Sequence, residues 1–192
     1  MLASADCAAS KRFARRMLRQ PFLLFAAALC AWALQTNPAR ADTTIGLDLD
    51  LHVPLSINNV DAGGGFGIRI GQQLHLPLVV INPEFGFTYA SFSKDEPPKM
   101  YRGIAGGRIG FGELLRFGVL AHIGFGYVDW EPGPNDWSHT GLTYDAGVFF
   151  EFTAIPLLNI GVHAIYNRIA ASDDLDDTLH WMSLGAHLTL VL

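Results

Sequence analysis

Cysteine and lysine are scarce in this chain, and each scarcity excludes a class of protein. The sequence has two cysteines, Cys7 and Cys30, and both lie within the first 41 residues. Beyond residue 41 the chain therefore can form neither a disulfide nor a thiolate metal site. Lys94 and Lys99 are the lysines that follow residue 41. So few lysines are unusual for strands that expose one face to water, where charged side chains are normally abundant.

The first 41 residues have the composition of a secretory signal peptide. The basic segment KRFARRMLRQ precedes the apolar run PFLLFAAALCAWAL, and Ala39-Arg40-Ala41 follows with small residues at the cleavage position. This order predicts Sec export and cleavage after Ala41, which leaves residues 42–192 as the mature domain. Met17 is an alternative start, because the sequence from Met17 onward is an ordinary signal by itself.

Removal of this segment changes the charge of the protein. It takes six of the 13 basic residues and one of the 18 acidic residues, and so leaves seven and 17, a net charge of −10. Such an acidic chain repels the phosphates of nucleic acid, so no nucleic-acid partner is expected. The remaining length is that of one domain.

Helical periodicity is also missing from residues 42–192, where apolar and polar residues alternate instead. Eight stretches show the alternation: TIGLDLDLHVPL, GGFGIRIGQQL, VVINPEFGFTYASF, MYRGIAGGRIGF, RFGVLAHIGFGYVDW, GLTYDAGVFFEF, LLNIGVHAIYN and HWMSLGAHLTLVL. MYRGIAGGRIGF alternates least well, because Ile104 interrupts its polar face. Short connections (QQLHLP, GELLR, AIPLL) alternate with longer polar ones (SINNVDAGGG, SKDEPPKM, EPGPNDWSHT, AASDDLDD). The sequence thus predicts an all-β fold, an eight-stranded antiparallel up-and-down transmembrane β-barrel.

Alternation alone does not say which face points outward. A soluble, lipocalin-like ligand-binding barrel of the periplasm would have the same pattern with its apolar face inside. The polar face is rich in glycine, which suits the crowded interior of a narrow barrel better than a solvated surface. Aromatic residues lie near the ends that carry the long loops and predict an interfacial girdle: Tyr89, Phe92, Tyr101, Tyr127, Trp130, Tyr144, Tyr166 and Trp181. The apolar face is therefore expected to meet lipid.

The end of the chain carries a recognisable pattern. Ser183, Gly185, Leu188 and Leu190 have the polar-x-Gly-x-x-apolar-x-apolar spacing of a C-terminal insertion signal, and Leu192 is the last residue. With this segment, residues 42–192 resemble the small outer-membrane barrels of the OmpA-type and OmpX-type family, which usually end in Phe or Trp. The resemblance implies the outer membrane of a Gram-negative cell, recognition by the barrel-assembly machinery and a monomeric state.

The inward face is expected to carry charges of both signs. The predicted network consists of Asp48, Asp50, His52, Arg69, Glu84, Arg102, Arg108, His122, Asp145, Glu151, His163 and His187. Unpaired charges in a narrow interior are costly, so these groups should pair and plug the barrel. A narrow path for ions or water through the network is the alternative.

Two of the histidines are expected to meet. If the last hairpin is centred on SDDLDD, His163 and His187 lie nearly opposite each other on adjacent strands. They could bind a metal, change charge near neutral pH, or simply form hydrogen bonds with a carboxylate or a polar group of a neighbouring strand. No set of four ligands at a defined spacing is visible, so neither a metal site nor a cofactor is predicted.

The loops are acidic, most of all at Asp173, Asp174, Asp176 and Asp177. Divalent cations could bridge these carboxylates to lipopolysaccharide phosphates, or the charge could serve loop solubility alone, since no regular calcium-ligand spacing is present. Outer-membrane lipid and lipopolysaccharide are the expected partners.

A lipid A-modifying acyl hydrolase or transferase is the alternative function. Its candidate residues are Ser138, His139 and Asp136, with Ser91 or His180 as neighbours. Adjacent residues of a strand point to opposite faces, so Ser138 and His139 are poorly placed to pair. The sequence therefore predicts an integral outer-membrane barrel with a structural or surface-interaction role and without catalytic activity.

Overall fold

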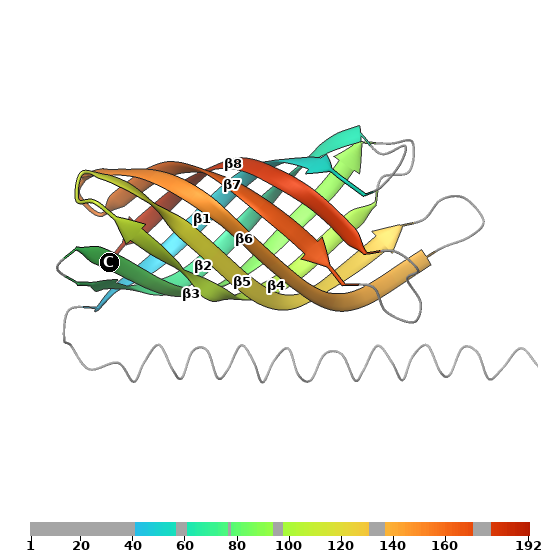
Figure 1. The fold of residues 1–192 in the computed structure, drawn as a ribbon, viewed down its shortest axis with the longest axis horizontal. Helices are drawn as coiled ribbons and strands as arrows, with labels where there is room; N and C mark the ends of the chain where they lie inside the picture. The colour runs from blue at the N-terminus through green and yellow to red at the C-terminus, as the bar shows by residue number, and fades with distance from the viewer. Residues whose placement is uncertain (1–40, 57–60, 77, 94–97, 131–136, 171–177) are drawn as a thin grey trace, which may run out of the picture. The chain divides into compact units, whose positions relative to one another are not determined.

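The computed structural model describes residues 41–56, 61–76, 78–93, 98–130, 137–170 and 178–192. These residues form eight strands and no helix. The strands are β1 (Ala41–Pro54), β2 (Asp61–His75), β3 (Val79–Ser93), β4 (Lys99–Phe111), β5 (Leu115–Trp130), β6 (Trp137–Ile155), β7 (Leu158–Ile169) and β8 (Leu179–Val191). Each strand pairs antiparallel with the next, and β8 pairs with β1 to close the barrel (Figure 1). The predicted fold class, a closed all-β barrel of eight antiparallel strands, is confirmed.

The seam between β1 and β8 runs from the Thr44–Val191 pair to the Pro54–Trp181 pair. It extends to the last residue, because the backbone N–H of Leu192 donates to the carbonyl of Thr43 at 2.8 Å. Strand closure therefore leaves no free sheet edge, which removes the hazard of edge-to-edge association. The chain ends at the short-turn end of the barrel, as Figure 1 shows.

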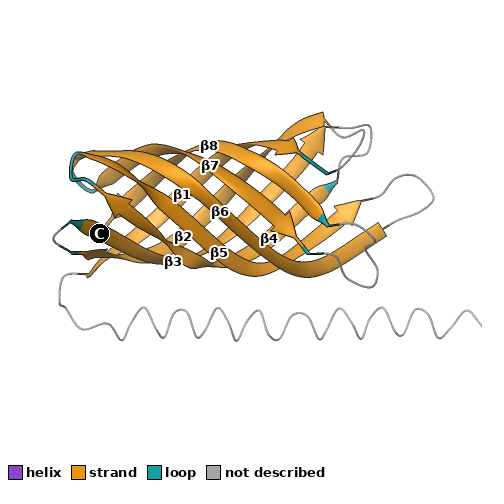
Figure 2. Cartoon of the chain, in the orientation of Figure 1, coloured by secondary structure: helices purple, strands orange, loops and turns teal. Residues whose placement is uncertain are grey.

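The two ends of the barrel differ in their connections (Figure 2). Two short connections are described throughout, between β4 and β5 and between β6 and β7. The first holds Gly112 at φ 107°, a conformation that favours glycine. At the other end, β2 begins at Asp61 and β6 at Trp137, so the loops expected at residues 56–65 and 131–140 are shorter than predicted. Ladder pairing continues into both segments, for example between Asp61 and Ser93.

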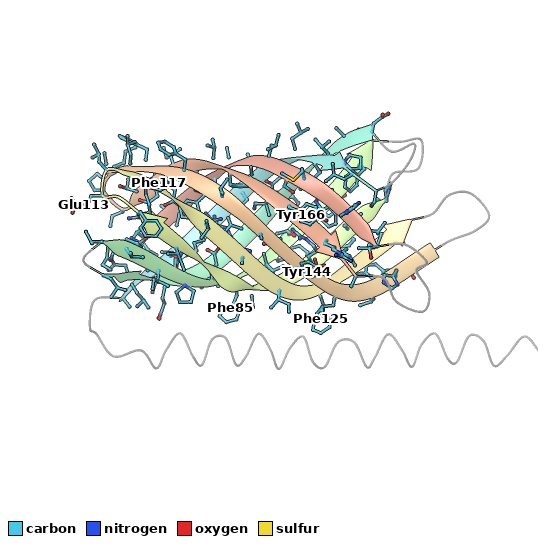
Figure 3. The ribbon with its side chains drawn as sticks, in the orientation of Figure 1. Phe85, Glu113, Phe117, Phe125, Tyr144 and Tyr166 are labelled. Atoms are coloured by element: carbon cyan, nitrogen blue, oxygen red, sulfur yellow. The ribbon has the colours of Figure 1, made fainter. Side chains whose placement is uncertain are left out.

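The apolar face of every strand points outward. Leu49 and Phe125 are each 70% exposed, and large apolar side chains with similar orientation surround the barrel. Figure 3 shows Phe85 and Phe125 projecting away from the wall. A soluble ligand-binding barrel would instead turn its apolar face inward. A continuous exposed apolar surface of this extent requires a nonaqueous covering.

The predicted aromatic girdle is partly wrong. Tyr89, Tyr101 and Tyr127 do form a row on the outer face, with ring centroids 5.2 and 6.3 Å apart along it. Phe92 and Trp181, in contrast, are buried inside the barrel, 2% and 0% exposed. Both residues fall on the inward parity of their strands, which overrides their nearness to the loops.

Several predictions concern residues outside the described ranges. Residues 1–40 of the predicted signal peptide and the acidic loop residues Asp173, Asp174, Asp176 and Asp177 are among them, as is the side chain of Trp130. Within the described part of the chain, no helix is long and apolar enough to cross a membrane.

Candidate functional site in the barrel interior

The barrel interior holds every residue expected for the polar network. Each occupies an inward position of its strand, and all of them are buried except Asp50, which is half-buried. Inward parity explains this placement, because alternate residues of a strand face the same side. All of these residues except His52 are joined into one set of hydrogen bonds and ion pairs, which we call the central network. His52 lies outside this set, because its Nδ1 atom contacts the hydroxyl of Ser183.

Glu84 is the hub of the central network and is 1% exposed. Its Oε2 atom accepts from Nη1 of Arg69 at 2.7 Å, and its Oε1 atom accepts from Nε of Arg108 at 2.8 Å. Nε2 of His122 lies 2.9 Å from the same Oε1 atom. Three cationic or donor groups from three strands thus converge on one carboxylate. Each of these contacts compensates part of the cost of burying the charge.

Asp48 is held by a two-point contact with Arg69. Nε of Arg69 donates to Oδ2 of Asp48 at 2.6 Å, and Nη2 donates to Oδ1 at 2.9 Å. This fork geometry is the strongest form of the arginine–carboxylate pair. Arg69 therefore connects Asp48 on β1 to Glu84 on β3.

His122 connects Glu84 to a second carboxylate. Its Nδ1 atom lies 2.7 Å from Oδ1 of Asp145, whose other oxygen is 3.5 Å from Nη1 of Arg102. Carboxylate oxygens only accept hydrogen bonds, so both ring nitrogens of His122 donate. The ring acts as a cation that links two carboxylates.

His163 and His187 meet, but not as a directly opposed pair. In the β7–β8 ladder His163 faces Gly185 and His187 faces Gly161, so the two histidines are diagonal neighbours. Their rings stack with centroids 5.3 Å apart, and their Nδ1 atoms are 3.1 Å apart. We call these two residues the histidine pair. The two histidines are close together, as the hairpin register predicts, but they are diagonal rather than directly opposite each other.

Several polar residues of the interior are missing from the predicted network. Arg116 ends the predicted connection GELLR and begins the predicted strand RFGVLAHIGFGYVDW, and no facing is predicted for it. Because β5 begins at Leu115, Arg116 faces inward, and its Nη1 atom lies 3.3 Å from Oε2 of Glu151. Thr44 donates to Asn82 at 3.2 Å. Asn167 donates to Ser183 at 2.8 Å, and Ser183 also lies 2.8 Å from Nδ1 of His52. Their alternation with outward residues is the signal that locates them.

The long-loop end of the interior is apolar. Side chains from five strands form one buried cluster, which we call the apolar cap: Ala90, Phe92, Met100, Val128, Ile169 and Trp181. Phe92 and Trp181 meet edge to face, with ring centroids 6.3 Å apart. Trp181 also touches the central network, because the guanidinium of Arg102 lies 5.1 Å from its ring centroid. The interior is thus filled by hydrogen-bonded charged side chains along one part of its length and by apolar side chains along another.

A small cavity lies among Gln73, Asn82, Arg116, Glu151, Asn159 and Thr189. Polar side chains line most of it, and Arg108 and Phe149 complete its wall. It reaches Glu151, which is also a neighbour of the histidine pair, since Nε2 of His187 lies 3.0 Å from Oε1 of Glu151.

The residues considered for acyl chemistry do not assemble. Ser138 is exposed, whereas His139 is buried in the interior, as their adjacency in a strand requires. Ser91 lies in β3 and His180 in β8, which are not neighbouring strands, and Nδ1 of His180 contacts the hydroxyl of Tyr166 at 3.0 Å. Asp136 lies outside the described residues.

Comparison with known proteins supports the fold. No protein-family model matches the sequence, and no curated protein does. Among solved structures, the barrel resembles Neisserial surface protein A, with a TM-score of 0.61 and 14% identity over 80% of this chain and 99% of the other. It also resembles Ail, the attachment invasion locus protein of Yersinia pestis, with a TM-score of 0.50 and 18% identity over 78% and 97% of the two chains. The outer membrane enzyme PagL aligns with a TM-score of 0.52 and 10% identity over 78% and 99%.

These similarities define the class to which the fold belongs. The protein has the closed, eight-stranded antiparallel fold of the small outer-membrane barrels.

Proposed function

We propose that the protein is an integral outer-membrane barrel with a structural or surface-interaction role, exported with removal of residues 1–41. The observation that carries this proposal is the apolar outer face of a closed barrel. Leu47, Leu49 and Leu184 are 53%, 70% and 49% exposed on neighbouring strands of the seam. A closed barrel satisfies its backbone groups internally and can therefore present such a face to lipid.

The filled interior favours a role that does not depend on transport. Eight strands leave just enough room for side chains, and here the central network and the apolar cap occupy it. Charges that are paired at 2.6–2.9 Å cannot hydrate a passing ion without giving up their partners. The lumen is accordingly assigned as a plug rather than a pore.

Surface interaction is assigned to the long-loop end. The resemblance to Ail, which is described as an attachment invasion locus protein, supports this assignment. The acidic sequence of residues 173–177 offers oxygen ligands for divalent cations that also bind lipopolysaccharide phosphates. Lipopolysaccharide is therefore the expected partner, together with the barrel-assembly machinery during insertion, and the protein is expected to act as a monomer.

An acyl-modifying enzyme is the competing function, because PagL has a similar fold. Acyl transfer requires a nucleophile, a base and an orienting carboxylate within reach of one another. The side chains of Ser183 and His52 do meet, at 2.8 Å, but both are buried in the barrel interior. This geometry supports the non-catalytic assignment.

An epitope inserted after Asp174 tests the proposed location. In intact cells the epitope is expected to bind antibody, because the long loops should face the exterior. A matched epitope after Glu113, in the opposite short turn, should bind only after the outer membrane is permeabilised. Antibody binding to the Glu113 epitope in intact cells, or to neither site after permeabilisation, would contradict the proposal.

A further inference from the structure

The histidine pair has an unusual arrangement of donors and acceptors. Nε2 of His163 lies 2.6 Å from Oδ1 of Asp50, and Nε2 of His187 lies 3.0 Å from Oε1 of Glu151. Carboxylates only accept hydrogen bonds, so both Nε2 atoms carry the proton. In a neutral imidazole the other nitrogen then presents a lone pair. The two Nδ1 lone pairs consequently face each other across 3.1 Å.

Two lone pairs at that separation repel unless one ring carries a proton that it donates to the other, or a metal ion binds both nitrogens. Two imidazole nitrogens bound to one tetrahedral Zn²⁺ at about 2.0–2.1 Å are separated by roughly 3.3 Å. The observed 3.1 Å is close to this separation. A histidine that donates its far nitrogen to a carboxylate is also the usual form of a metal-ligating histidine, because the carboxylate orients the ring and strengthens the ligand.

A third ligand atom converges on the same place. One carboxylate oxygen of Asp48 and one ring nitrogen each of His163 and His187 all lie within 4.8 Å of one another. All three residues are buried. Asp48 already accepts from Arg69, but each carboxylate oxygen has two acceptor positions, so a metal bond remains open to it.

We propose that His163, His187 and Asp48 bind a first-row divalent cation of the Zn²⁺, Ni²⁺ or Cu²⁺ class. Imidazole nitrogens with one carboxylate favour these ions over Ca²⁺ or Mg²⁺, which take oxygen ligands. Asp50 and Glu151 are positioning residues that orient the two rings. The site lies on β7, β8 and β1, so a bound ion ties the closing seam of the barrel to its neighbouring strand. This inference goes beyond the proposed function and does not depend on any loop partner.

Glycine makes room for both rings. A Cβ atom built on Gly161 would lie 2.5 Å from Nε2 of His187, and one on Gly185 would lie 2.5 Å from Nε2 of His163. Any larger residue at either position would displace the ring that faces it. The two positions that oppose the histidines in the ladder are thus the positions where a side chain would prevent the site from forming.

Charges of both signs surround the histidine pair. The carboxylates of Asp48, Asp50, Glu84 and Glu151 contact the pair or its neighbours, and they are balanced by Arg69, Arg108, Arg116 and His122. The small cavity reaches Glu151, whose Oε1 atom lies 3.0 Å from Nε2 of His187.

The full chain, expressed in a Gram-negative host with a tag that lacks histidine, provides the test. After extraction in detergent and removal of metal by a chelator, Zn²⁺ is added, and bound metal is measured by equilibrium dialysis and mass spectrometry. We expect one equivalent to bind. His163→Gln and His187→Gln should each abolish that binding, and Asp50→Asn should weaken it roughly 10- to 100-fold, as loss of an orienting partner does. His52→Gln, a buried histidine of the same interior, is the matched control and should bind like the native chain.

Spectroscopy provides a second readout that needs no variant. Cu²⁺ loaded into the native chain should show electron paramagnetic resonance couplings to two equivalent nitrogens. Failure of the native chain to bind, equal binding by the His163→Gln and His187→Gln variants, or absence of two-nitrogen coupling would overturn the proposal and leave a shared proton between the rings. Barrel formation is monitored separately by the gel mobility of unheated samples, so a failed metal site and a failed barrel give different results.

Discussion

The central network and the apolar cap fill neighbouring parts of one lumen by opposite means. The central network buries charges and satisfies them pairwise around Glu84, whereas the cap packs the large apolar side chains of Phe92, Met100 and Trp181 together. The stability of a charge pair depends on the orientation of its groups and on the presence of both partners. The stability of apolar packing depends on how completely the side chains fill the available volume. The lumen of a narrow barrel can thus be filled either by paired charges or by apolar side chains. We expect substitutions in the two regions to destabilise the protein by different amounts.

The two regions are in contact where Arg102 meets Trp181. Arg102 bonds to Thr88 at 3.0 Å and stands over the indole ring with its guanidinium. An arginine suits this boundary because its planar cation can pair with Asp145 on one side and stack on an aromatic face on the other.

The largest effect is expected at the hub of the central network. Glu84→Ala leaves Arg69, Arg108 and His122 buried with one fewer carboxylate, a loss of about 3–5 kcal/mol in the free energy of unfolding. Urea titration of the protein in lipid vesicles measures this loss. Glu113→Gln, in an exposed turn, is the control and should change the free energy by less than about 0.5 kcal/mol. A Glu84→Ala variant as stable as the control would show that the central network contributes nothing to stability.

A smaller loss is expected in the apolar cap. Met100→Ala removes a side chain that is 1% exposed and leaves a cavity, at a cost of about 2–4 kcal/mol. The same titration measures it against Leu184→Ala on the outer face, where lipid is expected to fill the space. Equal losses in the free energy of unfolding for Met100→Ala and Leu184→Ala would show that the cap is packed no more tightly than the outer face.

The contact between the two regions should couple them weakly. A double-mutant cycle of Arg102→Met and Trp181→Leu is expected to give an interaction energy of about 0.5–2 kcal/mol, the range of a desolvated cation–π contact. A coupling of zero, from the same urea titrations, would mean that the central network and the cap are energetically independent.

The smallest effect concerns conductance. Planar bilayers with the native chain should show no ion current above background, and Trp181→Ala should leave that result unchanged, because the central network still closes the lumen beneath the cap. A steady current in the Trp181→Ala variant would show that the cap alone forms the seal, and a current in the native chain would contradict the plug altogether.

Sequence reasoning predicts one region better than the other. Alternation and the excess of glycine on the polar face locate the strands, the outward apolar face and the central network, because parity decides facing. Phe92 and Trp181 were misplaced because aromatic residues near loops suggest an interfacial girdle, whereas their parity points inward. Ile104 interrupts the polar pattern of its strand because it is an apolar residue on the inward face, where it is 5% exposed.

Details of register and partner choice lie beyond the sequence. The diagonal offset of His163 and His187 follows from the strand register, which pairs each histidine with a glycine. The facing of Arg116 is not predicted, because the expected connection and the expected strand overlap at this residue, and the structure begins β5 at Leu115. The strand tilt decides which carboxylate each arginine contacts. The alternation of residues along the sequence carries no information about this tilt.

The most direct test of the central claim is fractionation of cells that express the full chain, followed by electrophoresis of heated and unheated samples. We expect the protein in the outer-membrane fraction, and we expect it to migrate faster before heating than after it, as a closed barrel that resists detergent would. Recovery in the soluble periplasm, with one mobility at both temperatures, would contradict the assignment of the exposed leucines to lipid and with it the proposed function.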